Sequence, residues 1–142
     1  MHLGEKRSDY FGAVAPPLIQ SSNFAFSTVQ SFREAFEDEA EKHLYSRGNN
    51  PTTLILRQKL AALEGSEDAM VLGSGAAAIA VAVMANVQAG DHIICVNKPY
   101  SWTQKLIGQF LPRFGLSFSF VDATDIQQIQ EAIRPNTRVL ML

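Results

Sequence analysis

The chain has 142 residues, of which 46% are hydrophobic and 18% charged, a composition that excludes an intrinsically disordered protein and predicts one domain. Twelve basic and fourteen acidic residues leave a formal net charge of −2, so no basic field is available for nucleic acid or an anionic membrane. The single cysteine, the lack of a signal peptide and the lack of an apolar stretch of about 18 residues favour a reduced, cytoplasmic protein with no membrane span.

The first part of the chain, residues 1–51, has no repeating pattern. Two consecutive prolines favour an extended backbone near its middle. A short helix is predicted over residues 29–37, and the acidic run that follows, residues 37–41, is interpreted as a solvated helix face. Residues 46–51 combine glycine, two asparagines and proline, which predicts a loop.

After Pro51 the sequence becomes periodic. Asn50 can cap a helix that has Pro51 in its first turn, and Gly65 ends that helix. Further helices are predicted over residues 76–87, over about 102–110 with a break at Pro112, and over about 126–133, and strands over residues 69–72, 92–96, 116–121 and 137–142. Strands that alternate with helices indicate a parallel sheet. Because such a sheet is normally covered on both faces, we expect the domain to continue beyond Leu142.

A glycine-rich turn follows the first predicted strand and opens a helix. Gly73, Ser74 and Gly75 precede Ala76, and the backbone N–H groups at such a helix start can bind phosphate. A tight turn that only packs the helix on the sheet is the structural alternative. The same residues fit a dinucleotide-binding turn, but that motif requires an acidic residue about 20 positions later, where residues 96–98 contain none.

Four motifs in order resemble the signature of one enzyme family. They are Ala15–Phe24 (APPLIQSSNF), Tyr45–Thr52 (YSRGNNPT), Leu60–Gly65 (LAALEG) and Ser74–Ile79 (SGAAAI). This pattern is similar to that of the Cys/Met-metabolism pyridoxal-phosphate (PLP) enzymes, among them cystathionine γ-synthase, the cystathionine lyases, methionine γ-lyase and O-acetylhomoserine sulfhydrylase.

The resemblance implies an α/β fold of the fold-type-I, aspartate-aminotransferase-like class. Residues 1–51 are expected to form an N-terminal arm and interface segment, and residues 52–142 the first part of the mainly parallel-sheet PLP domain. Together they correspond to about the first third of a family member. The resemblance also implies pyridoxal 5'-phosphate as cofactor, a small amino-acid substrate, and a homodimer or homotetramer with shared active sites.

The resemblance assigns five candidate site residues. Tyr45 and Arg47 match residues that reach the cofactor phosphate of a neighbouring subunit, and both side chains can donate to phosphate. Gly75 and Ala76 match backbone N–H donors to the phosphate in the same subunit. Tyr100 matches the aromatic residue that stacks on the pyridine ring and serves in proton transfer.

Some positions depart from the family pattern or allow simpler interpretations. The family usually has methionine at Ala76, and Ser101 and Trp102 replace smaller residues after Tyr100, which changes the local pocket. Tyr100 alone could merely cap a strand end. The three histidines lack the spacing of metal ligands, so no metal site is predicted, and His92 is interpreted as a structural residue at the start of a strand.

PLP chemistry needs a lysine that holds the aldehyde as a Schiff base and a carboxylate that keeps the ring nitrogen protonated. None of the five lysines stands in the family's S-x-T-K context; they are Lys6, Lys42, Lys59, Lys98 and Lys105. Lys98 lies two residues before Tyr100, and an extended segment there would place both side chains on one side. The catalytic lysine is therefore expected beyond this chain, which is expected to be inactive by itself.

The first functional hypothesis is therefore the N-terminal part of a PLP-dependent lyase or transferase of transsulfuration. It would carry out β- or γ-elimination or γ-replacement on cystathionine, methionine or O-acylhomoserine. The alternatives are a non-catalytic remnant that binds phosphate or a partner and, third, a Rossmann-type dinucleotide-binding module.

Overall fold

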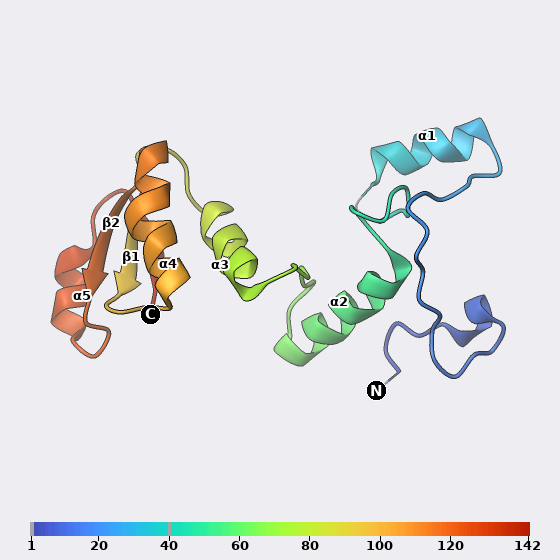
Figure 1. The fold of residues 1–142 in the computed structure, drawn as a ribbon, viewed down its shortest axis with the longest axis horizontal. Helices are drawn as coiled ribbons and strands as arrows, with labels where there is room; N and C mark the ends of the chain where they lie inside the picture. Colours follow the sequence, from blue (N-terminus) through green and yellow to red (C-terminus); the bar gives the residue numbers. More distant parts are fainter. Residues whose placement is uncertain (1, 40) are drawn as a thin grey trace. The chain divides into compact units, whose positions relative to one another are not determined.

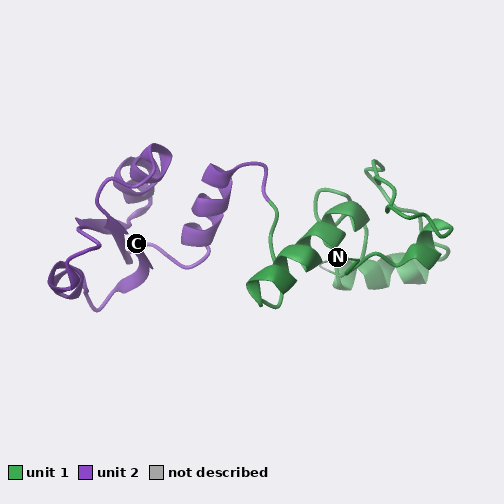
Figure 2. Ribbon diagram, turned by 90° about the horizontal axis from the view of Figure 1, so that it is seen from below, with its two compact units in different colours: residues 1–71 green, residues 72–142 purple. Residues whose placement is uncertain are grey.

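The computed structural model describes residues 2–39 and 41–142, and the chain divides into two compact units, Met1–Val71 and Leu72–Leu142 (Figure 2). Ala40, in the acidic run of the sequence, lies outside the described residues. Within the described residues no helix is both long and apolar enough to cross a membrane.

The first unit contains three helical elements. They are the 3-10 helix η1 (Arg7–Tyr10) and the α-helices α1 (Val29–Glu37) and α2 (Pro51–Glu64). Helix α1 has the predicted bounds and begins with a capping box, in which Thr28 and Ser31 exchange side-chain-to-backbone hydrogen bonds.

Helix α2 begins and ends where its sequence signals predict. The Thr52 N–H donates to Asn50 Oδ1 at 2.9 Å, and Pro51 occupies the first turn. Gly65 ends the helix with a φ of 66°, a left-handed conformation that glycine adopts without steric cost. The N-cap asparagine is the residue that the family motif places before the proline.

The extended arm is fixed to the start of α2 by side-chain hydrogen bonds. Asn50 Nδ2 donates to the Ile19 carbonyl at 3.0 Å and to Ser46 Oγ at 2.8 Å. In return, the Ile19 N–H donates to Thr52 Oγ1 at 2.9 Å. Because Asn50 is buried, these bonds satisfy an amide that would otherwise be costly to remove from water.

The second unit is a small α/β layer structure. Its elements are α3 (Gly75–Met84), β1 (His92–Val96), α4 (Ser101–Lys105), the π-helix η2 (Leu106–Phe110), the 3-10 helix η3 (Leu111–Phe114), β2 (Ser117–Val121), α5 (Ile126–Ala132) and β3 (Thr137–Met141). The strands form a parallel sheet in the order β2-β1-β3, which confirms the predicted parallel α/β architecture. Helices α4 and α5 lie on opposite sides of this sheet (Figure 1).

The central strand β1 carries the core. Its first four residues are buried on both faces, as expected for a middle parallel strand. Its neighbours come from α3, from the helical run after Tyr100 and from the loop before β2; the buried cluster consists of Val83, Ile93, Cys95, Ile107, Leu111 and Leu116. The carboxyl end of β1, at Val96, precedes Tyr100 by four residues.

Two element predictions were wrong. Residues 69–72 form no strand; they pair with no other strand, and the backbone of Ala69 is bonded to side chains, its N–H donating to Asp68 Oδ1 at 2.7 Å and its carbonyl accepting from Arg57 Nε at 3.0 Å. The helical run after Tyr100 does not break at Pro112. It continues to Phe114, since Pro112 lies in the first turn of η3, where its missing N–H is not needed.

Smaller corrections concern one helix end and one backbone conformation. Helix α3 ends at Met84 rather than at residue 87. Lys98 has a φ of 59°, so the segment before Tyr100 is not extended and the alternation argument for a shared side fails.

Candidate functional site

The first turn of α3 offers two backbone donors. Ser74 is the N-cap: its Oγ accepts from the Ala77 N–H at 3.1 Å, and its carbonyl accepts from the Ala78 N–H at 3.0 Å. Within the described residues no acceptor is found for the N–H groups of Gly75 and Ala76. Both residues are exposed, so the two donors are open to a ligand.

This turn fits a phosphate group. A side chain added at Gly75 would meet no atom within 4 Å, so the space in front of the backbone is open. The positive end of the α3 dipole adds favourable electrostatics for an anion. The donor set is neutral, which means that a ligand phosphate would need a cation from elsewhere to balance its charge.

Tyr100 lies at the carboxyl end of the central strand. It is the N-cap of α4, with φ −49° and ψ 137°, and its side chain makes no capping hydrogen bond. The ring is 61% exposed, so a ligand can contact its face. Ligands of parallel α/β sheets bind outside the carboxyl ends of the strands, and Tyr100 lies at such an end.

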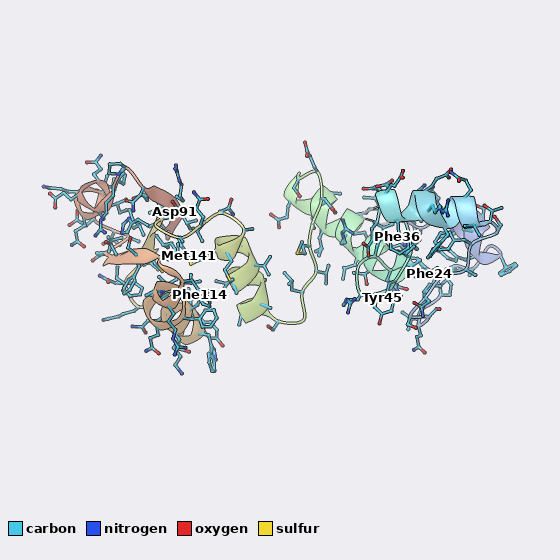
Figure 3. The ribbon with its side chains drawn as sticks, turned by 90° about the horizontal axis from the view of Figure 1, so that it is seen from above. Phe24, Phe36, Tyr45, Asp91, Phe114 and Met141 are labelled. Carbon is cyan, nitrogen blue, oxygen red and sulfur yellow. The ribbon has the colours of Figure 1, made fainter. Side chains whose placement is uncertain are left out.

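Tyr45 and Arg47 form a contacting pair in the first unit. The Arg47 guanidinium carbon lies 4.9 Å from the centre of the Tyr45 ring. The backbone of Tyr45 is fixed by an antiparallel bridge to Asn23 and by the Gly48 N–H, which donates to its carbonyl at 2.9 Å. Figure 3 labels Tyr45 in this unit.

The guanidinium of Arg47 is available to an anion. The side chain is exposed, and among residues 2–39 and 41–142 no carboxylate forms an ion pair with it. A guanidinium held on an aromatic ring retains its N–H fork for a bidentate contact with phosphate. Arg47 therefore presents a cation that no carboxylate of the described residues neutralises.

Among the predicted site residues, the structure brings one pair into contact. Tyr45 contacts Arg47 within the first unit, and Gly75 and Ala76 present adjacent N–H groups within the second, where Tyr100 follows β1.

The histidine at the start of β1 is a structural residue, as the sequence predicted. His92 is buried; its Nδ1 lies 2.8 Å from Thr137 Oγ1 and its Nε2 lies 3.0 Å from Ser119 Oγ. Burial lowers the pKa of His92, and the nearby Arg134 guanidinium lowers it further. The neutral ring links β1 to both neighbouring strands at their amino-terminal half.

Two lysines have partners that the sequence did not indicate. Lys59 forms an ion pair with Glu5, and hydrogen bonds from Lys59 and then His2 hold the pKa of the Glu5 carboxyl at about 2. The ammonium of Lys105 lies 4.4 Å from the centre of the Trp102 ring. Lys59 and Glu5 are far apart in the sequence, and Lys105 meets Trp102 through the geometry of a helix. Neither contact is indicated by a short sequence motif.

A groove in the second unit was also not foreseen. It has a volume of about 380 Å³ and lies between α3 and the helical run α4–η2–η3. Its lining includes Ala76 at one end. The π-turn of η2 that shapes it has no recognisable sequence signal.

Comparison with known proteins gives consistent matches along the whole chain. The family model described as "Cys/Met metabolism PLP-dependent enzyme" matches residues 1–142. An L-methionine gamma-lyase of Treponema denticola is 37% identical over 142 residues, which are 100% of this chain and 35% of that enzyme. The chain thus spans about a third of the length of this curated relative.

Solved structures agree with the fold. A cystathionine gamma-lyase from Lactobacillus plantarum, complexed with L-serine, matches 99% of this chain and 34% of its own, with a TM-score of 0.83 and 30% identity. A Campylobacter jejuni protein assigned as an O-acetylhomoserine (thiol)-lyase matches 93% of this chain and 32% of its own, with a TM-score of 0.86 and 29% identity. That structure carries N'-pyridoxyl-lysine-5'-monophosphate.

These relatives are PLP-dependent enzymes of sulfur amino-acid metabolism, and their fold is the predicted fold-type-I α/β class. With the family model matching every residue, the chain belongs to the Cys/Met metabolism family of PLP-dependent enzymes.

Proposed function

We propose that this chain provides the phosphate-binding part of a PLP-dependent enzyme that cleaves or exchanges substituents on sulfur amino acids or O-acylhomoserine. The observation that carries the proposal is the exposed first turn of α3, where the adjacent N–H groups of Gly75 and Ala76 have no acceptor within the described residues. When bound, PLP supplies an electron sink that makes the α-proton of an amino acid acidic enough to remove.

Different residues of the chain contact different parts of that cofactor. Gly75 and Ala76 donate backbone hydrogen bonds to phosphate oxygens, and Arg47 with Tyr45 supplies charge and a phenol donor to the phosphate of a neighbouring subunit. Tyr100 covers one face of the pyridine ring and offers a phenol for proton transfer. None of these roles requires the methionine that the family usually has at Ala76, because a backbone N–H donates whatever the side chain.

The same proposal gives each segment a role. Residues 1–51 form an arm that contacts a neighbouring subunit, and residues 52–142 form the first part of the cofactor-binding α/β domain. The assembly is a homodimer or homotetramer in the cytoplasm, with active sites shared between subunits. The proposal of shared sites is supported by the Arg47 guanidinium, which is exposed and has no carboxylate partner among the described residues.

Catalysis needs a lysine beyond the five of this chain. Lys59 is paired with Glu5, Lys105 rests on Trp102, and Lys98 has a left-handed backbone. We therefore propose that the 142-residue chain alone binds no cofactor covalently at a defined position and turns over no substrate.

Substitutions at Ala76 test the phosphate turn. Ala76→Pro removes one N–H donor without adding charge and, because proline is tolerated in a first helical turn, should keep α3 folded. In the complete enzyme that the proposal implies, we expect this variant to lose at least about tenfold in affinity for PLP, measured by absorbance titration, because a hydrogen bond to a charged group is lost.

Ala76→Met is the matched control. It keeps the N–H donor and introduces the usual family residue, so its affinity for PLP should equal that of the unchanged protein. If Ala76→Pro binds PLP as tightly as Ala76→Met does, the phosphate lies elsewhere and the proposal is wrong.

A further inference from the structure

Ser46 lies between the two side chains that the proposed function assigns to the phosphate of a neighbouring subunit. Residues 45–48 form a turn, which is closed by the Gly48 N–H donating to the Tyr45 carbonyl at 2.9 Å. Tyr45 and Arg47 are exposed, whereas Ser46 is half-buried. Of these three residues, Ser46 is therefore the one that packs into the protein, while the other two are open to a ligand.

Ser46 is bound to two other segments of the first unit. Its N–H donates to the Ser22 carbonyl at 2.9 Å, and its hydroxyl donates to the Ser21 carbonyl. The same hydroxyl accepts from Asn50 Nδ2 at 2.8 Å, at the cap of α2. Because a hydroxyl can donate and accept at once, this one side chain joins the turn to both the extended arm and the start of the helix.

The two exposed side chains have no such anchors. Within residues 2–39 and 41–142, neither the Tyr45 hydroxyl nor the Arg47 guanidinium makes a hydrogen bond or an ion pair. The contact of the guanidinium with the ring holds the two side chains to each other. Where the pair points is therefore determined by the backbone of the turn, and a misplacement of about 1 Å is enough to weaken a positioned binding group strongly.

We propose that Ser46 is a positioning residue for Tyr45 and Arg47. Its hydroxyl keeps the turn in the conformation in which the phenol and the guanidinium reach one phosphate, although Ser46 itself contacts no cofactor atom. This inference rests on the proposed function, in which the pair binds that phosphate. Because Ser46 acts through the pair, its effect on PLP binding exists only while the pair is present.

A double-mutant cycle in the complete enzyme that the proposed function implies tests this dependence. We expect Ser46→Ala to weaken binding of PLP to the apoenzyme about fivefold, measured by absorbance titration. In a background with Tyr45→Phe and Arg47→Ala, which removes both donors, the same substitution should change the affinity by less than about twofold. The urea midpoint should fall equally in both backgrounds, because the bonds to Ser21 and Asn50 are lost in each.

Ser66→Ala is the matched control. Ser66 Oγ donates to the Asp68 carbonyl at 3.0 Å, beyond the other end of α2, so this substitution also removes a serine hydroxyl that is bonded to the backbone. It should lower the urea midpoint and leave the affinity for PLP unchanged. Ser46→Cys is a second variant that keeps the cycle usable if Ser46→Ala does not fold. Its thiol is a weak donor and acceptor, so it should lose less affinity than Ser46→Ala does.

The outcomes separate this inference from the proposed function. If the background with Tyr45→Phe and Arg47→Ala binds PLP as tightly as the unchanged enzyme, the pair does not bind phosphate and the proposed function is wrong on that point. If that background loses affinity but Ser46→Ala does not, only the role of Ser46 is wrong. An equal loss for Ser46→Ala in both backgrounds, or an equal loss in Ser66→Ala, would show that Ser46 affects PLP binding through general stability alone.

Discussion

The buried imidazole of His92 makes the stability of the second unit depend on pH. In the folded chain its pKa is lowered below 6.5 by burial and by Arg134, whereas the unfolded chain has the ordinary value. The unfolded state therefore takes up a proton more readily. The contribution of His92 to the free energy of unfolding is complete above pH 6.5 and is lost as the pH falls below that value.

Urea denaturation at pH 7.5 and pH 5.5 measures this effect. The unchanged protein should have a lower midpoint at pH 5.5, and His92→Gln should show a smaller difference because it has no proton to gain. The carboxyls of Glu5 and Asp68 also have lowered pKa values, but they titrate below pH 4.5, outside this interval. An equal difference in both proteins would show that another group is responsible.

Arg47 provides a second prediction at the level of one side chain. Its guanidinium rests on Tyr45 and forms no ion pair within the described residues, so Arg47→Ala should leave the fold intact. In the complete enzyme that the proposal implies, it should weaken retention of PLP about tenfold, measured by dialysis and absorbance, because the charge that balances the phosphate is removed. Arg33→Ala, an exposed arginine of α1, is the control and should retain PLP normally. Unchanged retention in Arg47→Ala would contradict the assignment.

Sequence patterns predicted the role or conformation of some single residues and not of others. The structural role of His92 followed from its position at a strand start, and its hydroxyl partners Ser119 and Thr137 confirm that interpretation. The left-handed backbone of Lys98 was missed, since a lysine rarely adopts it and no local pattern indicates it. The assignments of Tyr45, Arg47, Gly75, Ala76 and Tyr100 to PLP stay predictions.

Among the elements, α2 depends most on its cap. Asn50 accepts from the Thr52 N–H and donates to Ile19 and Ser46, so one buried side chain both starts the helix and holds the arm. Asn50→Ala should lower the free energy of unfolding of the first unit by about 2 kcal/mol, the sum of a lost cap and of unsatisfied buried groups. Urea denaturation followed by far-UV circular dichroism measures the loss.

Asn50→Asp separates the two contributions. The carboxylate can still accept from the Thr52 N–H, which preserves the cap, but it cannot donate to the Ile19 carbonyl. The loss should be smaller than for Asn50→Ala yet above zero. A variant as stable as the unchanged protein would show that the bonds to the arm contribute nothing.

Elements with local signals were predicted well, and elements without them were not. The cap, proline and glycine of α2 act within a few residues, so both of its ends follow from the sequence. Residues 69–72 have the apolar composition of a strand, but a strand also needs a neighbouring ladder, and the sheet of the described residues contains only β2, β1 and β3. The π-turn of η2 likewise depends on packing, since Gly108 lies against Phe118 and Phe120.

At the scale of the whole molecule, four motifs predicted family and fold, and the matches over all 142 residues confirm both. Those motifs do not predict how the first and second units contribute to one site, because each motif determines only the structure of its own turn or loop. The dinucleotide alternative lacks support, since the family model accounts for the complete chain, including the glycine turn.

The ability of the chain to hold PLP covalently depends on its lysines. They are Lys6, Lys42, Lys59, Lys98 and Lys105. In the proposed site, a lysine that holds PLP would have to place its amine at the cofactor aldehyde, with the phosphate on the Gly75 turn and the ring on Tyr100. Neither Lys59, which is paired with Glu5, nor Lys105, which is held on Trp102, is free to do so.

Lys98 lies two residues before Tyr100, and its left-handed backbone breaks the strand-like alternation that would have aligned the two side chains. We expect treatment of the 142-residue chain with PLP and borohydride to leave scattered, substoichiometric pyridoxyl label, located by peptide mapping, and no turnover of cystathionine or methionine. Lys98→Gln should leave the total label almost unchanged, because surface amines react with the aldehyde indiscriminately. Stoichiometric label on one lysine together with turnover would show that the chain contains its own catalytic amine.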